Sequence, residues 1–74
     1  MDYSTLISIA DEYVRQGLIV EAIRILTVVK EDMSRVLHER QERDMNHYHG
    51  EVVQMIQINI SLVESRMAEI KKAL

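Results

Sequence analysis

The apolar residues of this 74-residue chain recur at intervals of three and four positions in three successive stretches. That spacing places them on one face of an amphipathic helix. The stretches cover about residues 2–16, 20–45 and 51–72, and the chain has no proline and only two glycines, Gly17 and Gly50. Each glycine falls between two stretches, where a turn is expected. The pattern predicts an all-α fold, an antiparallel three-helix bundle that forms a single domain over residues 1–74.

Local signals support these boundaries. Asp2 or Ser4 is placed to cap the first helix by accepting backbone N–H bonds. Gly17 follows the last turn of that helix, where a left-handed residue is favoured. The segment 54–62 alternates for a few residues and contains many β-branched side chains, which favours a strand locally. The helical stripe continues on both sides of it, so we predict a helix there.

The predicted core consists of the residues in the three stripes. They are Tyr3, Leu6, Ile7, Ala10, Tyr13 and Val14 in the first, Ala22, Ile23, Leu26, Val29, Met33, Val36 and Leu37 in the second, and Val52, Met55, Ile56, Ile60, Val63, Met67, Ile70 and Leu74 in the third. Asn59 interrupts the third stripe. It is either a buried polar residue that specifies register or a residue at the edge that faces water.

More apolar residues are present than three stripes require. The surplus comprises Ile9, Ile25, Val28, Val53, Ile58 and Leu62. A contiguous apolar patch usually marks a binding surface, whereas a broad stripe can also reflect a well-filled core. We favour the binding surface. The predicted partner contacts are Ile25, Val28, Met55, Ile58 and Leu62, with Arg24 and Arg66 as rim charges for an acidic peptide.

Composition and charge narrow the classes of partner. Nine basic and twelve acidic residues give a net charge of -3, whereas a nucleic-acid-binding domain normally has a basic face. No apolar run reaches the roughly 20 residues of a membrane-spanning helix. The absence of cysteine excludes disulfides and cysteine-based zinc sites. The N-terminus lacks the basic region of a signal peptide, so we expect a cytoplasmic protein. From the charge balance we expect no nucleic-acid partner, and from the short apolar runs we expect no membrane span.

Candidate catalytic and metal-binding chemistry is sparse. His38, His47 and His49 are the only histidines, and they do not have the spacing of a known zinc motif. The simplest interpretation is that they are exposed side chains of a polar turn. A metal- or pH-responsive switch at this turn is a distant alternative. The run from Arg35 to Arg43 interleaves arginine with glutamate, as a solvated helix face does. No glycine-rich loop or nucleophile turn is present. We expect neither an enzyme nor a cofactor.

The first helical hairpin resembles that of the MIT (microtubule interacting and trafficking) domain and, more loosely, a tetratricopeptide repeat. The matching residues are Ala10, Gly17, Glu21 and Ala22. The family usually has an aromatic residue two positions after the glycine, and Ile19 stands there instead. The third helix, 56–74, is also similar in length and stripe. The resemblance implies an adaptor that binds tails of ESCRT-III-type proteins between helices 1 and 3 or helices 2 and 3.

These observations lead to two functional hypotheses. In the first, the chain is a non-enzymatic interaction module that captures a helical or extended peptide of another protein in an apolar groove between helices. In the second, it is a small self-associating bundle, a dimer that acts as a bacterial or phage regulator or inhibitor of a larger protein. In both hypotheses the surplus apolar residues form the contact surface, with a peptide in the first and with a second copy of the chain in the second.

Overall fold

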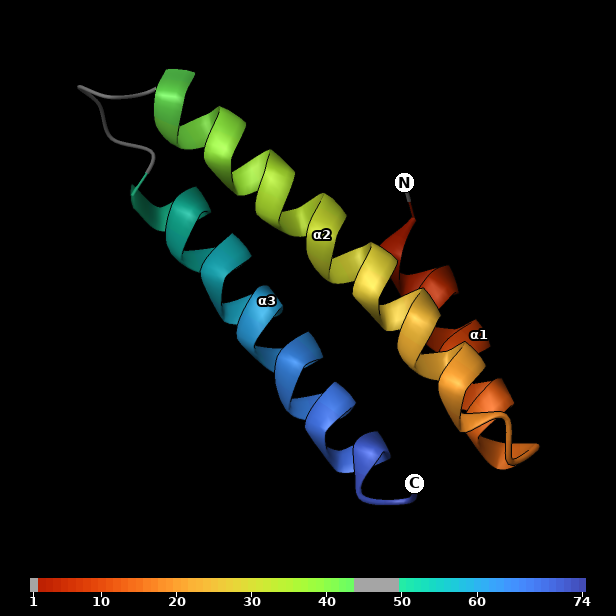
Figure 1. Cartoon of the computed structure of the whole chain (residues 1–74). Helices are drawn as coiled ribbons and strands as arrows, with labels where there is room; N and C mark the ends of the chain where they lie inside the picture. The colour runs from red at the N-terminus through yellow and green to blue at the C-terminus, as the bar shows by residue number, and fades with distance from the viewer. Residues whose placement is uncertain (1, 44–49) are drawn as a thin grey trace.

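The computed structural model describes residues 2–43 and 50–74 and confirms the all-α, three-helix class. The helices are α1 (Tyr3–Arg15), α2 (Ile19–Arg43) and α3 (Gly50–Lys71) (Figure 1). Because α3 is helical throughout, the strand alternative for 54–62 is excluded. The predicted end of the second helix and the turn that follows it fall mostly on residues 44–49, which lie outside the described residues.

The ends of α1 are closed by the residues that the sequence indicated. The Asp2 side chain accepts a hydrogen bond from the Thr5 backbone N–H at 3.2 Å, so Asp2 is the N-cap. Gly17 has a φ of 81° after the last turn. The Gly17 N–H bonds to the Val14 carbonyl at 3.0 Å, and the Leu18 N–H bonds to the Tyr13 carbonyl at 2.8 Å. These two bonds form a Schellman motif, which satisfies carbonyls that the helix end leaves free.

The long helix α2 is the centre of the arrangement. Both α1 and α3 pack along α2, while α1 and α3 scarcely touch each other. The shorter α1 lies against only one half of the α2–α3 hairpin, the half that contains the α1–α2 turn and the C-terminus (Figure 1). The Tyr3 hydroxyl, at the start of α1, reaches Asp32 of α2, and α2 continues beyond Asp32 to Arg43, a further distance of about 16 Å. Within residues 2–43 and 50–74, no third helix therefore covers the other half of the hairpin.

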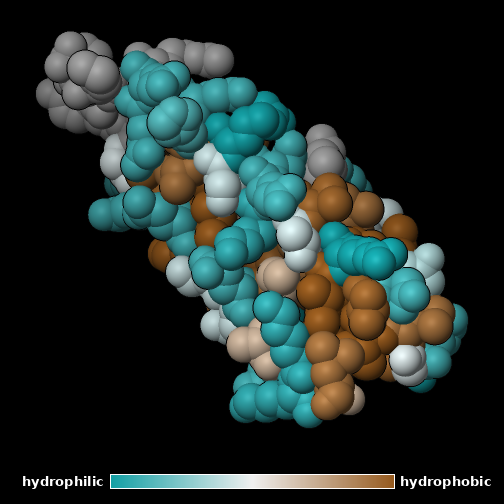
Figure 2. All heavy atoms as spheres, viewed as in Figure 1, coloured by the Kyte–Doolittle hydropathy of each residue, from teal (hydrophilic) through white to brown (hydrophobic). Residues whose placement is uncertain are grey.

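The hydrophobic core lies in the half that α1 covers. Among the residues whose burial is described, eight side chains are buried. They come from all three helices and each belongs to a predicted stripe: Ala10, Ala22, Leu26, Val29, Met33, Val63, Met67 and Ile70. On α2 the described buried residues extend no further than Met33, and on α3 they begin only at Val63. On the surface, Figure 2 shows the largest group of apolar atoms at the lower right of the visible face. The molecule is thin, with principal extents of 46 × 21 × 14 Å.

Several residues of the predicted stripes are not part of this core, namely Val36 and Leu37 of the second stripe and Val52, Met55, Ile56 and Leu74 of the third. Met55 was expected in the core as well as at the partner surface, yet it is 63% exposed because it lies in the half that α1 does not cover. Leu74 was also expected in the core and is 73% exposed, because it follows the end of α3. Asn59 is exposed, so of its two predicted roles, a buried specifier of register or an edge residue that faces water, the structure supports the edge residue.

Candidate protein-interaction surface

A row of large apolar side chains runs along the outer side of α3. Met55, Ile58 and Leu62 are 63%, 58% and 62% exposed. Their spacing of three and four residues places them on one helix face, one above the other. We call these three residues the α3 row. It is a contiguous apolar strip, and it contains three of the partner contacts predicted from the sequence.

The stretch of α3 that contains the α3 row carries no charge. The twelve residues from Val52 to Val63 include no Asp, Glu, Lys, Arg or His, in a chain that is 28% charged. Beside Ile58 and Leu62 the surface is formed by amide and hydroxyl side chains, namely Gln54, Gln57, Ser61 and Ser65. Depletion of charge around an apolar centre distinguishes the core of a protein interface from ordinary surface. The strip therefore has the composition of a contact site.

A groove between α1 and α3 adjoins the α3 row. It has a volume of about 420 Å³, and its lining residues are Tyr3, Ser4, Ile7, Ser8, Met33, Asn59, Leu62, Val63 and Arg66. We call it the α1–α3 groove. It exists because both helices pack on α2 and leave a gap between themselves. Leu62 belongs to both the groove and the α3 row, so the two features form one continuous surface.

Two polar contacts hold the walls of the groove in place. The Arg66 guanidinium donates to the Asp11 carboxylate and is the ion pair that joins α3 to α1. The Tyr3 hydroxyl donates to Asp32 at 2.6 Å and ties the start of α1 to α2. This bond, together with the Arg35 guanidinium, holds the pKa of Asp32 below its ordinary value. The same bond raises the pKa of Tyr3, since the carboxylate favours the protonated hydroxyl.

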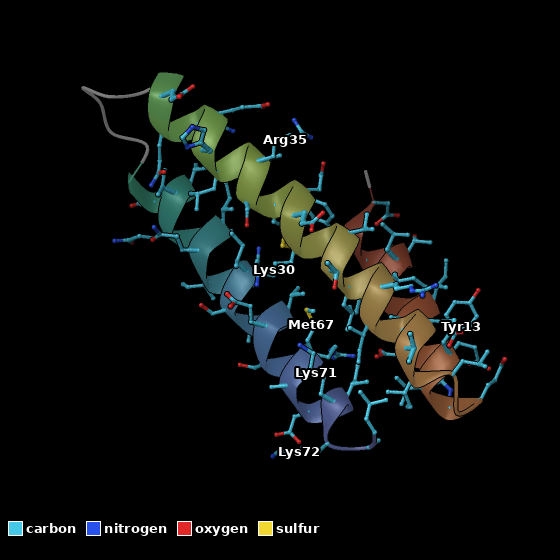
Figure 3. The ribbon with its side chains drawn as sticks, viewed as in Figure 1. Tyr13, Lys30, Arg35, Met67, Lys71 and Lys72 are labelled. Atoms are coloured by element: carbon cyan, nitrogen blue, oxygen red, sulfur yellow. The ribbon has the colours of Figure 1, made fainter. Side chains whose placement is uncertain are left out.

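The residues predicted on α2 lie apart from the α3 row. Lys30 extends from α2 toward α3, where it pairs with Glu64 at 3.6 Å (Figure 3). Val28 is two positions earlier, about 200° around the helix, so it points away from α3. It is 50% exposed, and Arg24, one turn earlier, is also exposed. Ile25 is partly buried against the core.

The seven predicted contacts therefore separate into two sets. Leu62 and Arg66 line the groove, and Met55 and Ile58 continue from Leu62 along the α3 row. Arg24, Ile25 and Val28 lie on α2. Sequence reasoning missed the α1 wall of the groove, to which Ser4 and Ser8 contribute. Their spacing of four residues was the available signal, since it places two small polar side chains on one helix face.

Other exposed apolar residues lie at the end of the molecule. Leu18 is 39% exposed and Val20 is 48% exposed, near the α1–α2 turn. Figure 2 shows apolar atoms at that end, beside polar ones. The neighbouring positions Glu21 and Arg24 are charged. Because charge is interleaved here, this region lacks the feature that distinguishes the α3 row.

Residues 2–43 and 50–74 show no metal-binding cluster of histidine and carboxylate side chains. His38 lies exposed on α2, with its Nε2 3.1 Å from the Glu42 carboxylate. His47 and His49 lie outside the described residues. Among α1, α2 and α3 as described, none combines the length and apolarity needed to cross a membrane.

Comparisons with protein-family models, with curated proteins and with solved structures each find no match for this chain. Its function is therefore argued from its own residues, above all from the uncharged strip on α3 and the groove beside it.

Proposed function

We propose that this chain is a non-catalytic protein-interaction module that binds an apolar helical segment on the α3 row and in the α1–α3 groove. One observation carries the proposal. Met55, Ile58 and Leu62 are all more than half exposed on one face, within a stretch of α3 that has no charged residue. A surface of this composition is stabilised when another apolar surface removes it from water.

The shape of the surface favours a helix as the ligand. An amphipathic helix presents apolar anchors every three or four residues, and the α3 row has the same spacing. The adjoining groove offers depth for one further side chain, with Met33 and Val63 among its lining residues. This location, between the first and third helices, is also one of the two sites implied by the resemblance to MIT domains.

The expected affinity is modest. Complete burial of a large apolar side chain contributes about 1.5–3 kcal/mol, so the exposed part of the α3 row contributes roughly 3–5 kcal/mol in total. The partner's apolar side chains add a similar amount, against an association cost of about 4–15 kcal/mol. The α3 row therefore suits a reversible contact, and a tighter one requires that the partner also fill the groove.

The charge pattern describes the contact face of that partner. Arg66 was predicted as a rim charge for an acidic peptide, and in the structure its guanidinium pairs with Asp11. The remaining neighbours of the α3 row are neutral amides and hydroxyls. We therefore expect a contact face of apolar residues flanked by neutral polar ones. The contribution of Arg24, Ile25 and Val28 to partner binding stays a prediction.

A model helix tests the proposal without knowledge of the natural partner. The probe is a synthetic water-soluble amphipathic peptide with leucine at every third or fourth position, titrated into ¹⁵N-labelled protein and followed by NMR. We expect amide shift changes to concentrate around Met55, Ile58 and Leu62 and at Ser4 and Ser8. The same peptide with its leucines replaced by serine is the control and should produce no shifts.

Two matched variants sharpen this experiment. Leu62→Glu places a charge in the surface and should abolish the shifts, whereas Val28→Glu makes a similar change at an exposed position on α2. Glutamate is a good helix former, so neither variant should lose helix content by circular dichroism. Shifts that centre on Leu18 and Val20, or that survive in Leu62→Glu, would overturn the proposal.

A further inference from the structure

We infer that the occupant of the α3 row is a second copy of this chain, which packs its own α3 antiparallel across a two-fold axis between Ile58 and Asn59. This inference rests on the proposed function, because it identifies the partner of the same surface. Three features of the chain carry it: the symmetry of the row, its charge pattern and the area that the monomer leaves exposed.

The α3 row is self-complementary about this axis. In a two-fold contact the same surface of each copy is used, and residues equally distant from the axis lie opposite each other. Met55 and Leu62 are equally distant from the point between Ile58 and Asn59, so Met55 of each copy meets Leu62 of the other. Ile58 lies beside the axis and meets the centre of the other helix. All three exposed apolar side chains are then covered.

The charges at the ends of the strip match as well. Glu51 and Arg66 lie equally far from the axis, so each glutamate faces the arginine of the other copy. A guanidinium has five N–H donors, so Arg66 can contact Glu51 of the second copy while it remains bound to Asp11. A parallel arrangement would instead bring Glu51 against Glu51. The charge pattern therefore selects the antiparallel orientation.

The neutral stretch of α3 is also where two copies of this chain can approach. Each carries a net charge of -3, so the chains repel on average. The stretch from Val52 to Val63 is long enough, at about 18 Å, to keep this repulsion out of the centre of a helix pair. A strongly charged partner would gain no electrostatic attraction from a neutral surface. A second copy has the same neutral surface to offer.

The exposed area is of the size that a small interface needs. The accessible surface of the chain is 5352 Å². That is about 600 Å² more than the roughly 4,700 Å² expected for a compact monomer of this mass. In small reversible interfaces each partner buries about 600 Å² or less. The excess belongs to the whole elongated chain, and a two-fold α3 contact of about that area per copy would fall in this small, reversible class.

Sedimentation equilibrium across a range from about 10 µM to 1 mM tests the inference directly. We expect the average mass to rise from 8.7 kDa toward twice that value. Ile58→Glu should raise the dissociation constant by more than about 100-fold, because the substitution enters a two-fold interface twice. Val28→Glu, the matched exposed position on α2, should leave it unchanged. A wild-type chain that stays at 8.7 kDa at 1 mM would overturn the inference.

The absence of cysteine allows the orientation to be tested separately. Single variants Met55→Cys and Leu62→Cys are oxidised alone and as an equimolar mixture. In the antiparallel pair the two cysteines of the mixture face each other, whereas identical residues at either position are about 10 Å apart along the axis, beyond the reach of a disulfide. Random pairing of the two variants gives the mixed disulfide a twofold excess over either homodimer, and we expect an excess well above twofold. Efficient crosslinking of Met55→Cys with itself would overturn the antiparallel arrangement.

These outcomes separate the inference from the proposed function. A monomeric chain that binds the leucine model helix on the α3 row refutes self-association and leaves the interaction module standing. A monomeric chain whose α3 row also fails to bind that helix refutes both. A dimer unaffected by Ile58→Glu uses another surface and refutes the inference alone.

Discussion

Because the core is small, the free energy of unfolding should depend strongly on Leu26. Its side chain is completely buried, in the first half of α2, and the buried cluster around it includes residues of all three helices. We expect Leu26→Ala to destabilise the chain by about 3 kcal/mol, toward the lower end of the range for buried leucine. The lower value follows from the 14 Å thickness of the molecule, which lets neighbouring side chains relax into the cavity.

This loss is large for a domain of 74 residues, whose total stability is expected to be about 4–11 kcal/mol. With a urea dependence of about 1 kcal/mol per molar, the unfolding midpoint should fall by roughly 3 M. The melting temperature should fall by about 12–24 °C, because each kcal/mol shifts a domain of this size by about 4–8 °C. The variant should remain partly folded at room temperature.

Leu62→Ala is the matched control, since it is the same substitution on a helix but at a 62% exposed position. At low protein concentration we expect it to cost less than about 0.5 kcal/mol. Urea denaturation followed by circular dichroism, at two protein concentrations, measures both. The Leu26→Ala cost should be independent of concentration, whereas the Leu62→Ala cost should grow with it if the α3 row is an interface. Equal costs for both variants at low concentration would refute the burial pattern.

Three further predictions follow from the helix ends and the uneven core. Gly17→Ala should lower the stability of the chain by about 1 kcal/mol in thermal melting, because Gly17 has a φ of 81°. Gly50→Ala is the control and should not destabilise the chain, because Gly50 has open space around it and no such φ. The lowered pKa of Asp32 gives stability that is present above its ordinary value of 3.8 and lost as the pH falls through the folded-state pKa. Tyr3→Phe removes the largest cause of that lowering, so the melting temperatures of variant and wild type should converge between pH 6 and pH 3. Hydrogen exchange should be faster in the half of the hairpin that α1 does not cover, and equal protection in both halves would contradict the description of the core.

Much of the fold was predictable because helical periodicity reports directly on burial. Every buried residue in the described part of the chain came from a predicted stripe, and the cap at Asp2 and the left-handed turn at Gly17 followed from residue type. These features depend on interactions within a few residues. A stripe shows which face of a helix is apolar, and that face is what the neighbouring helix covers.

The exposure of Met55 could not be predicted in the same way. Its periodicity is that of the core, but burial also requires a third helix at that level, and α1 begins only at Tyr3, which contacts Asp32 of α2. Likewise, the surplus residues Val28 and Ile58 look equivalent in the sequence, yet they lie on different sides of the molecule. The packing of α1 and α3 on α2 separates them, and it depends on contacts between residues distant in the chain.

The position of the α3 row relative to the core links stability to binding. Met55 and Ile58 precede Val63, the first described buried residue of α3, so they lie toward the half of the hairpin with the least burial. A ligand that binds only the folded chain stabilises it by mass action, by about 2.7 kcal/mol at a concentration 100 times its dissociation constant. A helix docked on the α3 row would supply apolar contacts close to the half of the hairpin that α1 does not cover. We therefore expect binding to slow hydrogen exchange most in this half, since a segment that opens easily has the most protection to gain.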